Sequence, residues 1–89
     1  MEDLRTILNR TGIAAGEFAA LVKVHRVTVQ HWLSGTVPRQ AMTKDAVASM
    51  MGLIQKAEKL KLIPHLSELG RTERLPAIRR ALRAAHQTA

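Results

Sequence analysis

The stretch EFAALVKVHRVTVQHWLSG, from Glu17 to Gly35, decides the fold of this 89-residue chain. Its apolar residues fall into two groups with the spacing i, i+3, i+4, which is typical of one face of a helix. A short break at residues 23–25 separates two such helices, so the pattern predicts a pair of short helices joined by a tight turn. The groups are Phe18, Leu21 and Val22, followed by Val29, Trp32 and Leu33.

Helical signals continue towards the N-terminus. Acidic residues before an apolar face predict a first helix over about 3–11, because acid stabilises a helix N-terminus and Gly12 favours its end. The two central helices are expected over about 16–23 and from residue 26 or 27 to residue 34, with Gly35 as the C-terminal stop.

The rest of the chain is also expected to be helical. Thr43 suits an N-cap, and one long helix is predicted to run through Gly52 to about residue 62, because no capping residue follows the glycine. Pro64 suits the first position of a short helical turn. The last helix is expected over about 74–86, because its apolar residues recur once per helical turn and form a stripe.

These elements predict an all-α fold, a compact bundle of five to six helices. We expect a helix-turn-helix domain over 1–62 and a C-terminal helical extension over 63–89. The apolar groups of the central helices should form the core with the first helix and with the Val47 and Met50 side of the long helix. Trp32 is expected near the edge of this core, because its indole N–H needs a partner.

The charge of the chain points to a polyanion as partner. Its 14 Lys and Arg exceed its 7 Asp and Glu, which gives a net charge of +7. Residues 37–89 hold ten of the basic and four of the acidic residues, a net of +6 in this part alone. Nucleic acid is the commonest polyanion inside a cell. With no cysteine, no long apolar run and an acidic N-terminus, we expect a cytoplasmic protein without a membrane partner.

Signals of an enzyme are weak in this sequence. The four histidines, His25, His31, His65 and His86, have no i, i+4 partner and no cysteine beside them. The serines lack a nucleophile elbow, and no glycine-rich phosphate loop is present. We therefore expect no catalysis, no metal and no cofactor.

The segment from Ala15 to Ser34 resembles the helix-turn-helix of the lambda-repressor-like (Cro and XRE) DNA-binding regulators. The resemblance is close over this segment and extends loosely over 1–62. It implies that the second helix of the pair lies in the DNA major groove. The positions that match the family pattern are Ala19, Val24, Val29, Trp32, Gly35 and Pro38.

Two positions depart from the family pattern. Lys23 stands at the turn, where the family usually has glycine, and a left-handed backbone there costs a lysine about 1 kcal/mol. Gly16 and Glu17 stand where the family often has a glutamine that touches phosphate. Because a carboxylate would repel a phosphate, we do not transfer that contact to Glu17.

The resemblance implies which residues meet DNA. The expected base-contacting residues are Arg26, Val27, Gln30 and His31. Their chemistry agrees, because arginine pairs with guanine, glutamine pairs with adenine and valine contacts the thymine methyl group. Phosphate contacts are expected from the flanks, where they fix register without reading sequence. These residues are Lys23, His25, Thr28, Ser34, Arg39 and Lys44.

The C-terminal part leaves two alternatives open. In one, its apolar stripe forms the interface of a homodimer. In the other, the stripe folds back on the core of its own chain while the arginines extend the DNA-facing surface, and the two are not exclusive. These arginines are Arg71, Arg74, Arg79, Arg80 and Arg83. Regulators with this motif usually dimerise, so we expect the interface. The stripe consists of Leu75, Ile78, Leu82 and Ala85.

The predicted function is a sequence-specific regulator of transcription of a small phage or bacterial type, and a repressor is favoured over an activator. The alternatives are an antitoxin that represses its own operon, or a protein-interaction module that keeps the motif as a scaffold. In those cases a toxin or a polymerase is a further partner. An exposed apolar C-terminal segment would distinguish a toxin-binding protein from a plain repressor.

Overall fold

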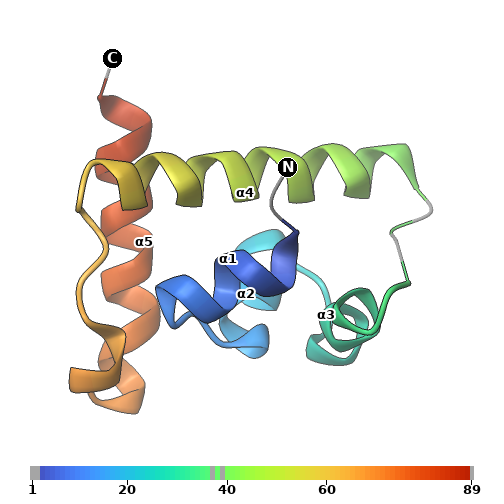
Figure 1. Ribbon diagram of the computed structural model, residues 1–89, viewed down its shortest axis with the longest axis horizontal. Coiled ribbons are helices and arrows are strands. Elements are labelled where there is room, and N and C mark those ends of the chain that lie inside the picture. The colour runs from blue at the N-terminus through green and yellow to red at the C-terminus, as the bar shows by residue number, and fades with distance from the viewer. Residues whose placement is uncertain (1–2, 37, 39, 89) are drawn as a thin grey trace.

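Local chemistry fixes where the first helices begin and end in the computed structural model, which describes residues 3–36, 38 and 40–88. The Asp3 carboxylate accepts a hydrogen bond of 2.9 Å from the backbone N–H of Thr6, and this bond lowers the pKa of Asp3. Gly12 ends the first helix with a φ of 82°. The helical elements are α1 (Leu4–Thr11), α2 (Ala15–Val22), α3 (Arg26–Leu33), α4 (Ala41–Lys59), the 3₁₀ turn η1 (Leu66–Glu68) and α5 (Arg71–Gln87) (Figure 1).

The described residues confirm the all-α prediction, since they contain helices and no strand. The turn between α2 and α3 has the expected strained lysine, because Lys23 adopts a left-handed backbone with φ 59° and ψ 48°. The long helix α4 continues through Gly52 without a break, as predicted.

Three predicted boundaries are wrong. Helix α4 begins two residues before Thr43, with Gln40 as N-cap, so Thr43 lies inside the first turn. Pro64 lies in the irregular segment before η1 and opens no helix. Helix α5 begins at Arg71 rather than near Arg74, because the Glu73 carboxylate accepts a hydrogen bond from the backbone N–H of Gly70 and caps the new helix.

One hydrophobic core joins all five α-helices. Phe18 of α2, Val29 of α3, Ile54 of α4 and Ile78 of α5 are fully buried in it, together with Ile7 of α1. In Figure 1, α4 lies along one side of α1 and α2, and α5 crosses the C-terminal end of α4. The predicted boundary at residue 62 therefore does not separate two cores. Trp32 is half-buried against this core, as expected.

The stripe of α5 belongs to the core of its own chain. Ile78 and Ala85 are 0% exposed and Leu82 is 4% exposed, while Leu75 is half-buried. Side chains packed in this way are not available to a second copy. The assignment of Ile78, Leu82 and Ala85 to a dimer interface is therefore wrong, because these side chains fold back on the core of their own chain. The assignment of the half-buried Leu75 stays a prediction.

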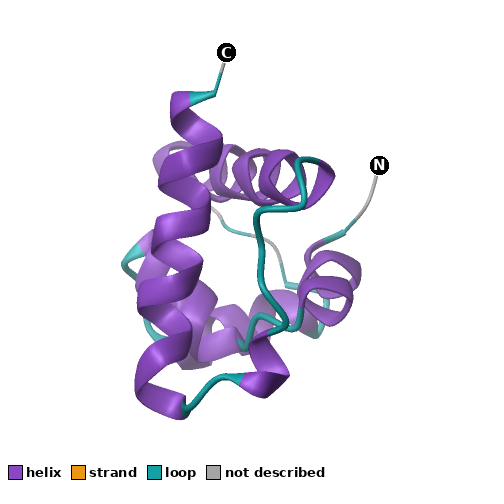
Figure 2. Ribbon diagram, turned by 90° about the vertical axis from the view of Figure 1, so that its left-hand side faces the viewer, coloured by secondary structure: helices purple, strands orange, loops and turns teal. Residues whose placement is uncertain are grey.

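Helices α3 and α5 lie on opposite sides of the α1 and α2 pair. Figure 1 has α5 at the left and α3 at the lower right, and in Figure 2 α5 crosses the near side of the molecule. Between them, α1 is tied to the end of α3 because the Arg5 guanidinium donates to the backbone carbonyl of Leu33. This arrangement separates the outward faces of the two helices.

Candidate nucleic-acid interface

The four residues predicted to contact bases form one exposed face of α3. Val29 is fully buried on the opposite side of the helix, and Trp32 and Leu33 pack against the core beside it. All four predicted residues are exposed, and the apolar Val27 is 56% exposed. Since a helix turns about 100° per residue, they share one surface in the order Arg26, Gln30, Val27 and His31.

The middle of this face therefore consists of Gln30 and Val27, with Arg26 and His31 at its edges. We call this set the α3 face. It combines an amide, an aliphatic group, a guanidinium and an imidazole within one helix of eight residues. This variety of donors, acceptors and apolar groups is what reading base edges requires.

Three of the six residues predicted to contact phosphate are exposed basic side chains. Lys23 and His25 are exposed in the turn before α3, and Lys44 is exposed in the first turn of α4. Arg39 lies outside the described residues. The structure therefore provides exposed basic side chains at the beginning of α3 and in the first turn of α4.

The two hydroxyl residues of this set are less available. The Ser34 hydroxyl donates a hydrogen bond of 3.0 Å to the Gln30 backbone carbonyl, so it caps α3. Thr28 is half-buried and lines a groove with Trp32 and Pro38, between α3 and the beginning of α4. This position is on the side of α3 that turns towards α4.

Arg26 lies across the beginning of α2. A Cβ atom built on Gly16 would lie 3.2 Å from Cδ of Arg26, so only glycine leaves room for the aliphatic part of this arginine in its present position. Arg26 lines a cavity of about 570 Å³ with Arg71 from the beginning of α5. Neither arginine has a hydrogen-bond or ion-pair partner among the described residues.

The acidic residue of this cavity is already neutralised. Glu17 accepts hydrogen bonds of 2.9 and 3.1 Å from the Arg74 guanidinium and a third of 2.8 Å from the backbone N–H of Ala14. The bond from Arg74 is the main reason why the pKa of Glu17 is lowered, and the same bond raises the pKa of Arg74. The cavity is therefore a basic one.

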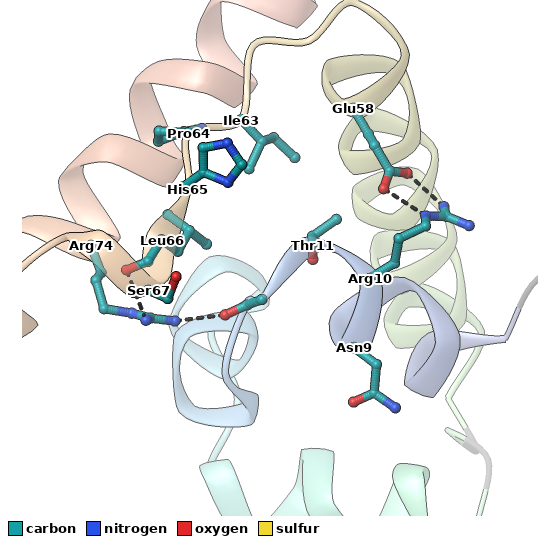
Figure 3. A pocket seen from close by; sticks show the side chains of 11 residues that line it. Asn9, Arg10, Thr11, Glu58, Ile63, Pro64, His65, Leu66, Ser67 and Arg74 are labelled. Atoms are coloured by element: carbon teal, nitrogen blue, oxygen red, sulfur yellow. Dashed lines mark hydrogen bonds and ion pairs between the residues drawn. The ribbon is translucent and has the colours of Figure 1, made fainter.

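Arg74 connects the C-terminal helix to the helix-turn-helix. Besides Glu17 it donates to the backbone carbonyl of Leu66 at 3.1 Å and to that of Gly12 at 2.6 Å (Figure 3). The alternative in which Arg74 extends a DNA-facing surface does not hold for this residue, because these bonds occupy its guanidinium. No sequence signal could have identified the pair, since the partners lie 57 residues apart.

A second cavity, of about 350 Å³, lies beside Arg74 between α1, the end of α4 and the segment before η1 (Figure 3). Two of its charged residues, Arg10 and Glu58, pair with each other, because the Arg10 guanidinium donates a hydrogen bond of 2.6 Å to the Glu58 carboxylate. Within residues 3–36, 38 and 40–88, no three His, Asp or Glu residues are grouped as metal ligands. No helix in the same ranges combines the length and the apolar character needed to cross a bilayer.

Comparison with models of known protein families, with curated proteins and with solved structures finds no match for this chain. The resemblance to the lambda-repressor-like regulators therefore stays a prediction that depends on the residues of the α2–α3 segment.

Proposed function

We propose that the chain binds double-stranded DNA with the α3 face in the major groove and regulates transcription in this way. The observation that carries the proposal is the contiguous exposed face of Gln30, Val27, Arg26 and His31 opposite the fully buried Val29. The major groove is about 12 Å wide and admits a helix of about 10–12 Å in diameter. Burial of Val29 and half-burial of Trp32 hold this helix rigidly on the core.

The order of residues on the α3 face assigns their roles. Gln30, near the middle, pairs with the N6 and N7 atoms of an adenine, and Val27 contacts a thymine methyl group. Arg26 lies at the edge of the α3 face, in the cavity that it shares with Arg71. From this edge it reaches either a guanine or a backbone phosphate. Lys23, His25 and Lys44 contact phosphates on either side.

The burial of the α5 stripe bears on the kind of regulator. The apolar stripe of α5 is buried, so the described residues have no exposed apolar C-terminal segment of the kind that an antitoxin would offer to a toxin. This favours a plain DNA-binding regulator over the antitoxin alternative. A homodimer stays part of the proposal, but its interface must lie outside the buried residues of this stripe.

Selection of bound sequences from a random DNA pool tests the proposal. We expect an enriched site with one adenine that depends on Gln30. Gln30→Ala should weaken binding to this site by about 1–3 kcal/mol and relax the preference at that base pair. Lys44→Ala is the matched control, because loss of a phosphate contact should weaken binding to selected and random DNA equally. No enrichment at low salt, or equal effects of both variants on both kinds of DNA, would disprove sequence reading by the α3 face.

A further inference from the structure

The side of α5 that points away from the core carries three exposed arginines. Arg79, Arg80 and Arg83 lie opposite the buried Ile78 and Leu82. Arg79 and Arg83 are four residues apart, which places them about 6 Å apart along the helix axis. We call this set the α5 arginine face.

The charge of the α5 arginine face is not neutralised within the chain. None of its three arginines has an ion-pair or hydrogen-bond partner among the described residues. The only acidic residue of α5 is Glu73, which caps the beginning of the helix through the backbone N–H of Gly70. Three like charges on one face repel one another, so an external anion would stabilise them.

The chemistry of the face favours nucleic-acid phosphates over other partners. Protein interfaces depend on buried apolar or aromatic anchors, but the other exposed residues on or beside this side, Thr72, Glu73, Pro76, His86 and Gln87, include no large apolar side chain. Insertion into a bilayer needs a free apolar face, and that of α5 is buried in the core. Nucleic-acid phosphates bind to positive charge without any apolar anchor, and the planar guanidinium binds a phosphate with two parallel hydrogen bonds.

We propose that the α5 arginine face is a second DNA-binding surface, which binds the backbone of another duplex without reading its sequence. The beginning of α5 lies near Arg26, which shares a cavity with Arg71, but Arg79 and Arg83 lie about two and three turns further along the helix. This part of α5 lies on the opposite side of α1 and α2 from α3 (Figures 1 and 2), so a duplex in contact with the α3 face leaves the α5 arginine face free. The chain then bridges two DNA segments. Bridging rests on the proposed function of the α3 face, but binding of a random duplex by the α5 arginine face does not, so the two proposals can fail separately.

A bridging experiment tests the proposal with the full chain. A duplex that carries the sequence selected by the protein is fixed to beads, and capture of a fluorescent random-sequence duplex is measured. Wild-type protein should capture it, and Arg79→Gln/Arg83→Gln should lose this capture while it still binds the fixed duplex. Lys59→Gln/Lys61→Gln removes the same charge from the exposed end of α4 and should keep most of the capture. Unchanged thermal unfolding shows that each variant is folded.

A solution measurement separates the two surfaces. Val27→Glu places a carboxylate in the α3 face, and the remaining binding to a random duplex should depend on the α5 arginine face. In that background, Arg79→Gln/Arg83→Gln should flatten the plot of log affinity against log salt by about 1.8, since each lost phosphate contact contributes about 0.9.

The outcomes distinguish this proposal from that for the α3 face. If Val27→Glu leaves the DNA affinity unchanged but Arg79→Gln/Arg83→Gln still loses binding to the random duplex, the α3 proposal fails and the α5 proposal stands. The α5 proposal would be overturned if Arg79→Gln/Arg83→Gln captured as much random duplex as the wild-type protein. It would also be overturned if Lys59→Gln/Lys61→Gln lost as much capture as the arginine variant. Capture of a poly(glutamate) peptide instead of the duplex would also overturn it, because the partner would then be an acidic protein.

Discussion

The outward faces of α3 and α5 differ in chemistry although both belong to helices anchored in the same core. The α3 face presents four different side chains, including Gln30 and the exposed Val27. The α5 arginine face presents one kind of charged group three times. The comparison teaches that positive charge by itself supports binding to any DNA, whereas discrimination between base pairs needs a mixture of hydrogen-bonding and apolar groups.

The inward and outward sides of α5 should respond very differently to substitution. Leu82→Asp places a carboxylate in the core, where Leu82 is 4% exposed, and should destabilise the fold by about 3–5 kcal/mol or more. Arg83→Gln, the next residue on the exposed side, should change stability by less than about 0.5 kcal/mol. Urea unfolding followed by circular dichroism measures both. A stably folded Leu82→Asp protein would show that the stripe of α5 is not part of the core.

The link between the two helical regions should depend on pH. Glu17→Gln removes the charge that binds Arg74 and should cost about 1–3 kcal/mol of stability at pH 7. The pKa of Glu17 is lowered in the folded chain, so its contribution is present above the ordinary value of 4.5 and is lost as the pH falls through the folded value.

Urea unfolding of wild type and variant at pH 7 and pH 3 checks this sign. The difference between them should shrink at the lower pH. Glu68→Gln is the control, because this exposed carboxylate has no bonded partner in the part of the chain that the structure describes. A difference that grows at pH 3 would contradict the ion pair.

Two glycines offer the smallest and sharpest comparison. Gly16→Ala places a methyl group 3.2 Å from Arg26 Cδ, so the flexible arginine should shift and DNA affinity should fall a few-fold. Gly52→Ala meets nothing within 4 Å and should stabilise α4 by about 0.5–1 kcal/mol without an effect on DNA. Thermal unfolding and mobility shifts measure both. Equal DNA affinity of the two variants would show that the position of Arg26 is unimportant.

The sequence predicted the features that depend on near neighbours. The short helices α1 to α3 follow from apolar spacing, and the local stops at Gly12 and Lys23 lie where expected. The beginning of α5 was missed although Gly70 and Glu73 carry a local capping signal. The α3 face was also predicted as a set, because four polar or exposed positions share one side of a helix.

Features that depend on distant residues could not be predicted in this way. Periodicity in α5 indicates a buried stripe, but it does not say whether the chain itself or a second copy covers Ile78 and Leu82. The same limit applies to Arg74, whose charge suggested a contact with DNA until its partner was known. The position of Arg26 over Gly16 likewise depends on how α2 and α3 pack.

The span of the bond between Glu17 and Arg74 has a consequence for synthesis on the ribosome. The partners are 57 residues apart, so Arg74 emerges long after α2 and α3 have been made. Until then Glu17 keeps its local bond from the backbone N–H of Ala14 but lacks its cationic partner, so its negative charge would repel a phosphate near Arg26. Helix α5 therefore supplies the positive charge that neutralises Glu17 in α2. A chain whose translation stops before α5 should bind DNA less well than the finished protein.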